Sequence, residues 1–234
     1  MTQQLQTSRR TPLNRGRVLA AAVVLADEVG LDALSMRRLA EVLGVVPMAL
    51  YKHVANKDEL LDGMVDAVIG EIAPVASGAG WKIAVRLRVL SARQALLRHP
   101  WSRQALESRT NRTPAVLAYT DEFIGLFLAG GFSVDLTHHV MHALGSRMWG
   151  FTQELFNAAA SGAEAAMPPE AQAAMAQEMA LRYPNILQVA TAARHDDGSV
   201  VSYGCDDQFE FEFALDLMLD GFERLHGQRW SSSG

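Results

Sequence analysis

The segment from residue 35 to residue 57 constrains the fold of this chain more than any other feature. It predicts two short helices separated by Gly44, a residue typical of a helix end. Ser35 can cap the first helix, and Pro47 falls in the first turn of the second, where a missing N–H costs nothing. A longer helix is expected before them, from about Asn14 to Val29. Two short helices joined by a glycine turn after a longer helix form the outline of a helix-turn-helix.

Small or apolar residues stand where these two helices must meet. Ala40, Gly44 and Leu50 suit a close crossing of the two helices, and Val45 and Val54 suit their shared core. The other side of the second short helix is then left exposed.

Helical spacing of apolar residues continues along the chain, so we predict an all-α fold. A Pro-, Gly- and Ser-rich stretch at 74–80 marks a boundary. We therefore expect a flexible basic arm over 1–12, a three-helix helix-turn-helix domain within 13–73 and a helical C-terminal domain over 80–227. The helices expected after the helix-turn-helix span about residues 56–72, 80–98, 100–108, 113–129, 133–160, 169–182 and 206–226, with a loop at 184–204.

The net charge of −5 is unevenly distributed along the chain. Residues 1–57 hold eight Lys and Arg against four Asp and Glu, whereas the remainder holds 13 basic and 22 acidic residues. A basic end on an acidic body favours a polyanion partner such as nucleic acid at the N-terminal part.

Composition and apolar runs argue against export and against a membrane span. Cys205 is the only cysteine, which favours a reducing, cytoplasmic compartment. The longest apolar run, Val18 to Ala26, is far shorter than the roughly 20 residues of a membrane span. Arg9 and Arg10 before it are similar to an export signal, but Pro12 interrupts the approach and the run continues in helical register.

The exposed side of the second short helix can lie in the major groove of DNA. Arg37, in the preceding helix, can reach a base edge or a phosphate, and Tyr51 and Lys57 can bond phosphates. Three residues of this region also have an interpretation that involves no DNA. Met48 could be a core residue, His53 a structural histidine and Lys57 a solvated residue in the first turn of a helix.

Four motifs in this region resemble the N-terminal domain of the tetracycline-repressor (TetR) family over about residues 13–72. They are Ser35-Met36-Arg37-Arg38-Leu39-Ala40, Leu43-Gly44-Val45, Leu50-Tyr51-Lys52-His53-Val54 and Asn56-Lys57-Asp58-Glu59-Leu60-Leu61. A weaker resemblance to the C-terminal domain of the tetracycline-repressor branch lies at 131–133 and 211–221.

The resemblance implies a dimeric transcriptional regulator, usually a repressor, that binds palindromic operator DNA and responds to a small molecule. The residues that would then face DNA are Ser35, Arg37, Val46, Pro47, Met48, Ala49, Tyr51, Lys52, His53 and Lys57. Met48 and Ala49 offer no hydrogen bonds to bases, so their readout would be apolar, for example to a thymine methyl. Lys52 replaces the commoner aromatic residue of the family.

A dimer is expected because one short helix contacts few bases, and specific binding usually needs two half-sites. The last predicted helix has two apolar stripes, and a helix that is apolar on two sides must bury both. One stripe would pack within the chain and the other on a partner, unless this is simply a central core helix. The candidate interface residues are Phe209, Phe213, Leu217 and Met218.

An effector pocket is expected among aromatic and flexible apolar residues that lie near a few polar groups. For any one of these residues, a role in the core is an equally natural interpretation. The candidates are His99, Trp101, Arg103, Met141, Leu144, Arg147, Met148 and Trp149. The polar residues of a tetracycline–magnesium site have no residue-by-residue match here, so we do not predict tetracycline as the effector.

The alternative hypothesis is a small helical metal-binding protein or enzyme centred on His138, His139 and His142. Two histidines at i, i+4 can bind a transition metal. The sequence lacks a nucleophile elbow and a phosphate-binding glycine loop. We therefore predict that the chain is not an enzyme and needs no cofactor or metal.

Overall fold

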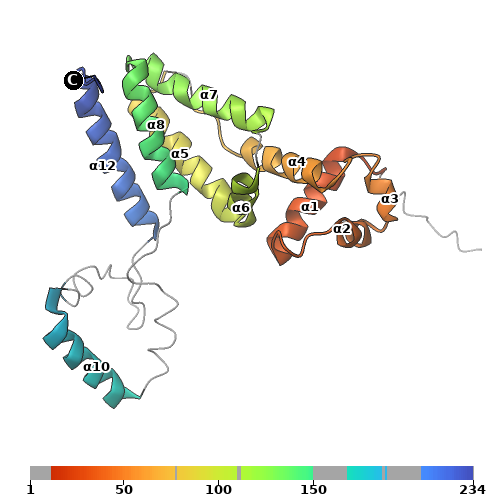
Figure 1. The fold of residues 1–234 in the computed structure, drawn as a ribbon, viewed down its shortest axis with the longest axis horizontal. Coiled ribbons are helices and arrows are strands. Elements are labelled where there is room, and N and C mark those ends of the chain that lie inside the picture. Colours follow the sequence, from red (N-terminus) through yellow and green to blue (C-terminus); the bar gives the residue numbers. More distant parts are fainter. Residues whose placement is uncertain are drawn as a thin grey trace, which may run out of the picture. The chain divides into compact units, whose positions relative to one another are not determined.

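The computed structural model describes residues 12–76, 78–109, 112–149, 168–185, 188 and 207–233. Every regular element in these ranges is a helix (Figure 1), which confirms the predicted all-α fold. The predicted helix boundaries hold to within a few residues. The predicted basic arm, the end of the helix predicted at 133–160 and nearly all of the predicted loop at 184–204 lie outside the described residues.

Capping side chains define the two long helices of the N-terminal part, α1 (Arg15–Val29) and α4 (Lys57–Gly70). Asn14 Oδ1 accepts a hydrogen bond from the N–H of Arg17 at 2.8 Å, and Asn56 Oδ1 accepts one from the N–H of Glu59 at 2.7 Å. Each cap satisfies a backbone donor that the first turn of a helix leaves without a partner. Glu59 in turn accepts from the N–H of Ala55 at 2.7 Å, so the chain before α4 is held on both sides.

The two short helices are α2 (Met36–Leu43) and α3 (Pro47–Leu50). Ser35 Oγ accepts from the N–H of Arg38 at 3.2 Å, as a cap should. After α3, Tyr51 to His53 form a turn, and the Leu50 carbonyl accepts from the amides of His53 and Val54.

Gly44 ends α2 as expected of a glycine at a helix end, but the close crossing that was also expected there is absent. We expected a close crossing of α2 and α3 at this residue, but a Cβ placed on Gly44 would meet nothing within 4 Å. Its φ of 66° and ψ of 36° lie in the left-handed region instead. Only glycine adopts that conformation without strain from a Cβ, so backbone geometry requires the residue.

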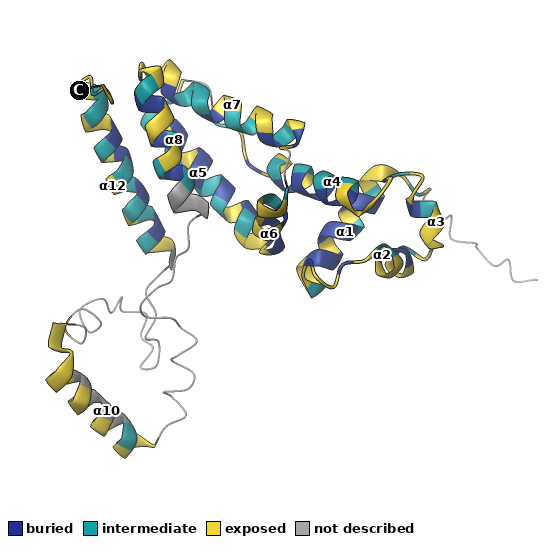
Figure 2. Cartoon of the chain, in the orientation of Figure 1, coloured by how far each residue is buried: buried dark blue, intermediate teal, exposed yellow. Residues whose placement is uncertain are grey.

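We call α1–α4 the head. Its core lies between α1 and α4, where a Cβ on Gly63 would come within 2.6 Å of the Leu19 side chain. The absence of a side chain at Gly63 therefore lets the two helices approach closely. Leu39 from α2, Leu50 from α3 and Val54 after it are almost completely buried in the same head (Figure 2). Burying such apolar side chains contributes about 1.5–3 kcal/mol each.

The helices that follow the head are α5 (Trp81–Arg98), α6 (Trp101–Ser108), α7 (Pro114–Ala129) and α8 (Val134–Trp149). An aromatic cluster joins α5 to the end of α7. Trp81 lies with its ring centroid 4.6 Å from that of Phe132, and Phe127 lies 5.3 Å from Phe132, both edge-on. Edge-on aromatic pairs stabilise a core beyond the area that they bury.

Two further helices are described, α10 (Pro169–Arg182) and α12 (Asp207–Gly227). The described residues fall into two compact units that divide within α8, after Met141, and the residues from Ser231 onward belong to the first unit. Ser232 donates to the Asp135 carboxylate from both its N–H, at 2.7 Å, and its hydroxyl, at 2.8 Å. Among the described helices, none has the length and apolar character that crossing a bilayer requires.

The left-handed backbone at Gly44 makes a direct prediction. Gly44→Ala is expected to lower the free energy of unfolding by about 1 kcal/mol, because an L-residue is strained in this conformation. Gly70→Ala is the matched control, since Gly70 lies within α4 and has open space around it. The control should be neutral or slightly stabilising, because Ala favours helix over Gly. Urea unfolding followed by circular dichroism measures both, and equal effects would contradict the assignment.

Candidate nucleic-acid interface

The α3 helix presents an exposed apolar face. Met48 is 72% exposed and Val46 is 68% exposed, while Leu50 on the opposite side is completely buried. The interpretation of Met48 as a core residue is therefore wrong. Tyr51 and Lys52, in the turn after α3, are exposed as well. A short helix anchored on one side and open on the other fits the width of the DNA major groove.

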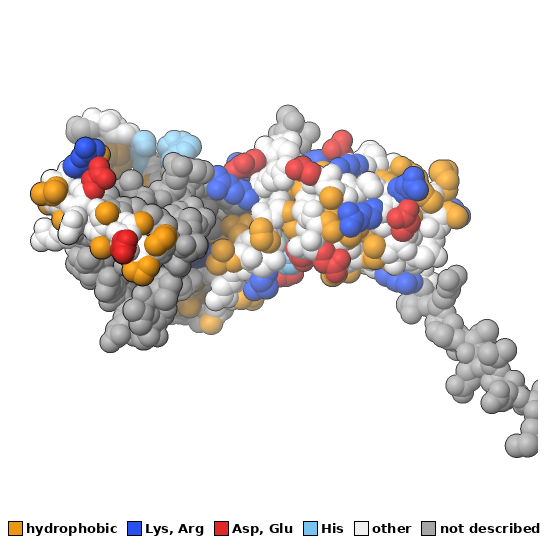
Figure 3. Space-filling model, turned by 90° about the horizontal axis from the view of Figure 1, so that it is seen from below, with side chains coloured by type: hydrophobic (Ala, Val, Ile, Leu, Met, Phe, Trp, Pro, Cys, Tyr) orange, Lys and Arg blue, Asp and Glu red, His pale blue; other side chains and the backbone are white. Residues whose placement is uncertain are grey.

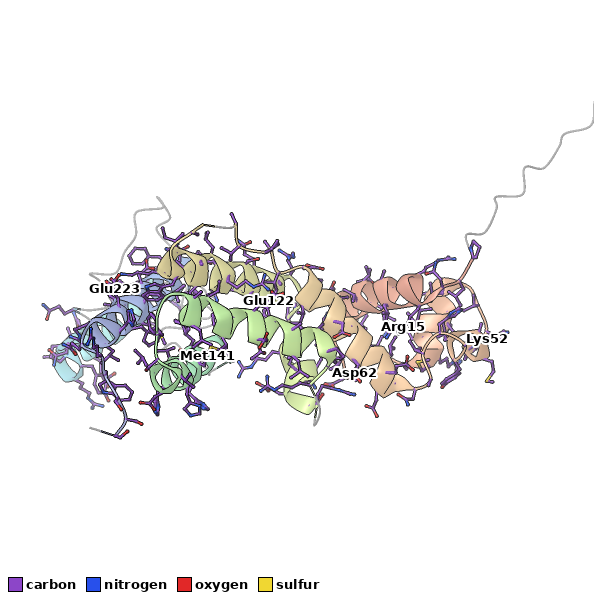
Figure 4. The ribbon with its side chains drawn as sticks, turned by 90° about the horizontal axis from the view of Figure 1, so that it is seen from above. Arg15, Lys52, Asp62, Glu122, Met141 and Glu223 are labelled. Carbon is purple, nitrogen blue, oxygen red and sulfur yellow. The ribbon has the colours of Figure 1, made fainter. Side chains whose placement is uncertain are left out.

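Cationic side chains surround this apolar face. Figure 3 shows Lys and Arg side chains beside hydrophobic ones over the head. Lys52, labelled in Figure 4, projects from the side of the head that lies far from Glu122 on α7. Lys57 is the first residue of α4 and is exposed. The N-terminus of a helix attracts phosphate through its dipole and its N–H groups, so the position of Lys57 reinforces its charge.

Arg37 is held in place by a neighbour on its own helix. Its Nε donates to Glu41 Oε1 at 3.1 Å, and both side chains are largely exposed. An arginine recognises guanine or phosphate through a fork of N–H donors. Glu41 thus orients the guanidinium on the surface that carries α3.

The ten residues predicted to face DNA belong to α2, α3 and the first residue of α4, or stand close to these helices in the chain. All are exposed except Ala49 and His53, which are half-buried. The sequence interpretation missed Glu41, although its i, i+4 spacing from Arg37 was a usable signal. It also missed Val42, an exposed apolar residue near the end of α2.

Two of the predicted pocket residues lie elsewhere, at a polar contact between the head and α5–α6. His99 Nδ1 is 2.8 Å from Asp27 Oδ1, and Trp101 Nε1 donates to the same oxygen at 2.6 Å. His99 Nε2 is 3.1 Å from Glu71 Oε1. The polar atoms of both candidates therefore bind α1 and the end of α4 rather than face a cavity. We call Asp27, Glu71, Arg98, His99 and Trp101 the joint.

Arginines add further contacts between the head and the following helices. Arg98 donates to Glu71 Oε2 at 2.7 Å, and this hydrogen bond, followed by that of His99, holds the pKa of Glu71 below its usual value. After α6, Arg109 pairs with Asp58 at 2.9 Å and with Asp62, labelled in Figure 4, at 2.8 Å. These contacts hold the end of α5 against the end of α4, and the end of α6 against the first half of α4.

Arg88 joins α5 to the chain just after α4. It is buried, donates to the Ala73 carbonyl at 2.8 Å and pairs with Glu122 of α7 at 2.9 Å. Its guanidinium lies 4.8 Å from the centre of the Tyr119 ring. Burial raises the pKa of the Tyr119 hydroxyl to about 12, against an opposing effect of Arg88.

The remaining pocket candidates are not gathered into a cavity within the described residues. Arg103 pairs with Glu107 on its own helix at 2.8 Å, Met141 is half-buried and Leu144 is buried. The side chains of Arg147, Met148 and Trp149 lie outside the described residues. A shallow pocket of about 240 Å³ between the end of α1 and α6 includes Trp101. It is smaller than the roughly 300–1,000 Å³ of most ligand sites.

The three histidines of the alternative hypothesis lie on α8 with exposed side chains. His139 Nε2 is 3.7 Å from Asp135 Oδ1, and the His138 and His139 rings meet edge-on at 5.2 Å. Across the part of the chain that the structure describes, no three His, Cys, Asp or Glu residues form a group that can hold a metal ion. The structure therefore gives the metal-binding alternative no support.

An anchored short helix with an exposed apolar and cationic face, followed by a helical second domain, defines a helix-turn-helix transcriptional regulator. Comparison with protein families agrees with this class. Residues 18–64 match the family of bacterial regulatory proteins of the tetR type, and residues 73–226 match the tetracyclin repressor-like C-terminal domain. The chain belongs to the TetR family.

Individual relatives support the same assignment. The transcriptional repressor DrrR1 of Streptomyces coeruleorubidus is 31% identical, over 94% of this chain and 81% of the relative. A transcriptional regulator of Saccharopolyspora erythraea is 38% identical over 53% of this chain, which spans 54% of that relative's length. The structure of ActR from Streptomyces coelicolor in complex with actinorhodin has a TM-score of 0.65 and 26% identity, and covers 93% of this chain and 100% of that one.

Proposed function

We propose that this protein is a dimeric, ligand-responsive repressor that binds a palindromic operator in the cytoplasm. The observation that carries the proposal is the exposed face of α3, with Met48 and Val46 among the most exposed apolar residues of the head. Exposed apolar side chains beside cations fit a major groove, in which thymine methyl groups and phosphates lie close together.

Two copies of the head are needed for specificity. The α3 helix has only four residues and so reaches few base pairs. Two such helices would read half-sites about 34–36 Å apart, one turn of DNA from each other. A two-fold protein then matches a palindromic sequence.

We propose that α12 supplies the dimer interface. Its first apolar stripe, which includes Phe211 and Leu215, is buried. Its second stripe, Phe209, Phe213 and Leu217, is about half exposed at i, i+4 and i+8 spacing. A second copy of the chain would cover this stripe, and Met218 lies half-buried beside it.

We propose a small apolar or amphipathic molecule as the effector, bound by the C-terminal domain. The support is the match to the tetracyclin repressor-like C-terminal domain and the similarity to ActR, whose structure was determined with actinorhodin. The effector would bind better to a conformer whose heads no longer match the spacing of the half-sites. By linkage, operator DNA must weaken effector binding by the same factor. The proposal includes no catalytic activity, cofactor or metal.

Removing the Arg37 side chain tests the DNA face. Arg37→Ala is expected to weaken operator binding about tenfold or more, since a bidentate contact to a base contributes about 1–3 kcal/mol. Arg103→Ala is the matched control, because Arg103 also forms an exposed i, i+4 pair, on α6. Fluorescence anisotropy at fixed salt, with a duplex selected by the wild-type protein, measures both. Equal affinities of the two variants would contradict the proposed interface.

The apolar readout has its own test, which combines a protein change with a base change. Replacing thymidine by deoxyuridine removes only the C5 methyl group from the major groove. At the base contacted by Met48, loss of the methyl group is expected to weaken wild-type binding about fourfold. This factor corresponds to the burial energy of one methylene-sized group, about 0.8 kcal/mol. Met48→Ala should bind the two duplexes equally. A deoxyuridine scan without any position that depends on Met48 would exclude the apolar readout while leaving DNA binding intact.

The dimer is tested by a charge in the exposed stripe of α12. Phe213→Asp is expected to give monomers at micromolar concentration and to reduce operator binding, because an unpaired charge cannot be buried cheaply at an interface. Leu181→Asp, at an exposed apolar residue of α10, is the control and should leave the mass unchanged. Sedimentation equilibrium measures both, and a persistent Phe213→Asp dimer would place the interface elsewhere.

A further inference from the structure

His99 lies where α5 ends and α6 is about to begin, and it is 7% exposed. Its two ring nitrogens face carboxylates from two different parts of the head. Nδ1 is 2.8 Å from Asp27 Oδ1 on α1, and Nε2 is 3.1 Å from Glu71 Oε1 directly after α4. One ring therefore joins α1 and the end of α4 to the start of the C-terminal domain.

The chemistry of this contact requires a particular protonation state. An ionised carboxylate only accepts hydrogen bonds, whereas a neutral imidazole has one donor and one acceptor nitrogen. With both nitrogens against carboxylates, a neutral ring would direct a lone pair at one of them. Only the imidazolium, in which both nitrogens donate, satisfies the whole arrangement.

The other groups around the ring are consistent with this state. From α6, Trp101 Nε1 donates to Asp27 Oδ1 at 2.6 Å. From α5, Arg98 donates to Glu71 Oε2 at 2.7 Å. Two carboxylates thus face two cations, His99 and Arg98, and the joint is charge-balanced only when His99 carries its proton. At the edge of the joint, Gln104 donates to Asp32 at 3.2 Å and adds one more acid to the side of α1.

We propose that protonated His99 is a positioning residue for operator recognition, an imidazolium bridge that fixes the head on α5–α6. This inference rests on the proposed DNA-binding function. A head that is fixed in place loses less conformational freedom when two half-sites are bound at once. Loss of the proton breaks one of the two contacts, loosens the head and weakens operator binding.

The direction of the pH dependence follows from the two partners. The bridge is present while His99 is protonated and is lost as the pH rises and the ring loses its proton. On the acid side, the lowered pKa of Glu71, caused first by Arg98 and then by His99, keeps its carboxylate ionised until the pH falls below the usual range for glutamate. Linkage to one proton changes the affinity by at most about tenfold per pH unit.

The test is operator affinity between about pH 6 and pH 9, the range that includes the titration of histidine. His53 is a second histidine, at the proposed DNA face, so every protein carries His53→Gln to remove its contribution. In this background the affinity is expected to fall with rising pH. His99→Gln and Asp27→Asn are expected to remove that slope, because neither retains an imidazolium bridge between two carboxylates. Arg103→Ala, on the exposed side of α6, should keep it.

Two outcomes would overturn the proposal. One is a slope that persists in both variants, even if their affinity is lower at every pH, which is the result expected of a merely structural residue. The other is a slope of the opposite sign. Should His99→Gln fail to fold, the ¹⁵N shifts of the His99 ring in the parent chain decide instead, since they distinguish an imidazolium from a neutral tautomer at pH 7. If the pH experiment contradicts the imidazolium bridge but Arg37→Ala still weakens operator binding, only the bridge is refuted and the proposed DNA-binding function is retained.

Discussion

The head depends on how two residues anchor its smallest helix. The α3 helix has four residues and cannot be stable alone, because isolated helices shorter than about 12 residues are marginal in water. Leu50 and Val54 fix it by being almost completely buried in the head, where α3 packs against α2. With Leu50 pointing inward, Met48 must point outward. The anchoring that makes α3 a helix thus also determines which side chains it presents.

Charged and apolar side chains have different roles in the proposed DNA interface. In the proposed interface, the apolar tip of α3 would contribute little electrostatic attraction for DNA, so affinity would come mainly from exposed cations such as Arg37, Lys52 and Lys57. Contacts of this kind with phosphates release counterions and depend on salt, whereas contacts with a thymine methyl do not. Under this proposal, phosphate contacts would position the head, and the few residues of α3 would distinguish sequences.

Helix ends and apolar stripes could be predicted from the sequence because they depend on residues that are close together in the chain. Ser35 was recognisable as a cap, and its hydroxyl accepts a hydrogen bond from an amide three residues on. The two stripes of α12 were likewise visible as a helical period, and the structure buries one and exposes the other. Local spacing fixes such features before any tertiary contact forms.

The roles of His99 and Trp101 could not be predicted, because they depend on contacts between residues that are far apart in the chain. Trp101 looked like a pocket residue because it is large and aromatic, and His99 because it is a polar group within an apolar stretch. Their partner Asp27 lies more than 70 residues away, and no periodicity connects them. Gly44 shows a different limit, because its role at a helix end was readable from the sequence, whereas the close helix crossing also expected there was wrong.

A polar joint also suits a switch better than an apolar one would. Exposed ion pairs such as that of Arg98 contribute about 1 kcal/mol or less each, and the hydrogen bonds of the buried His99 and Trp101 contribute about 1–3 kcal/mol each. Allosteric coupling between two sites typically amounts to about 1–3 kcal/mol. An effector that disturbed only two or three contacts of Asp27, Glu71 or Arg109 would therefore supply enough energy to release the head. The buried apolar core between α1 and α4 would stay intact, so the head would move as one body and keep α3 ready for the next operator.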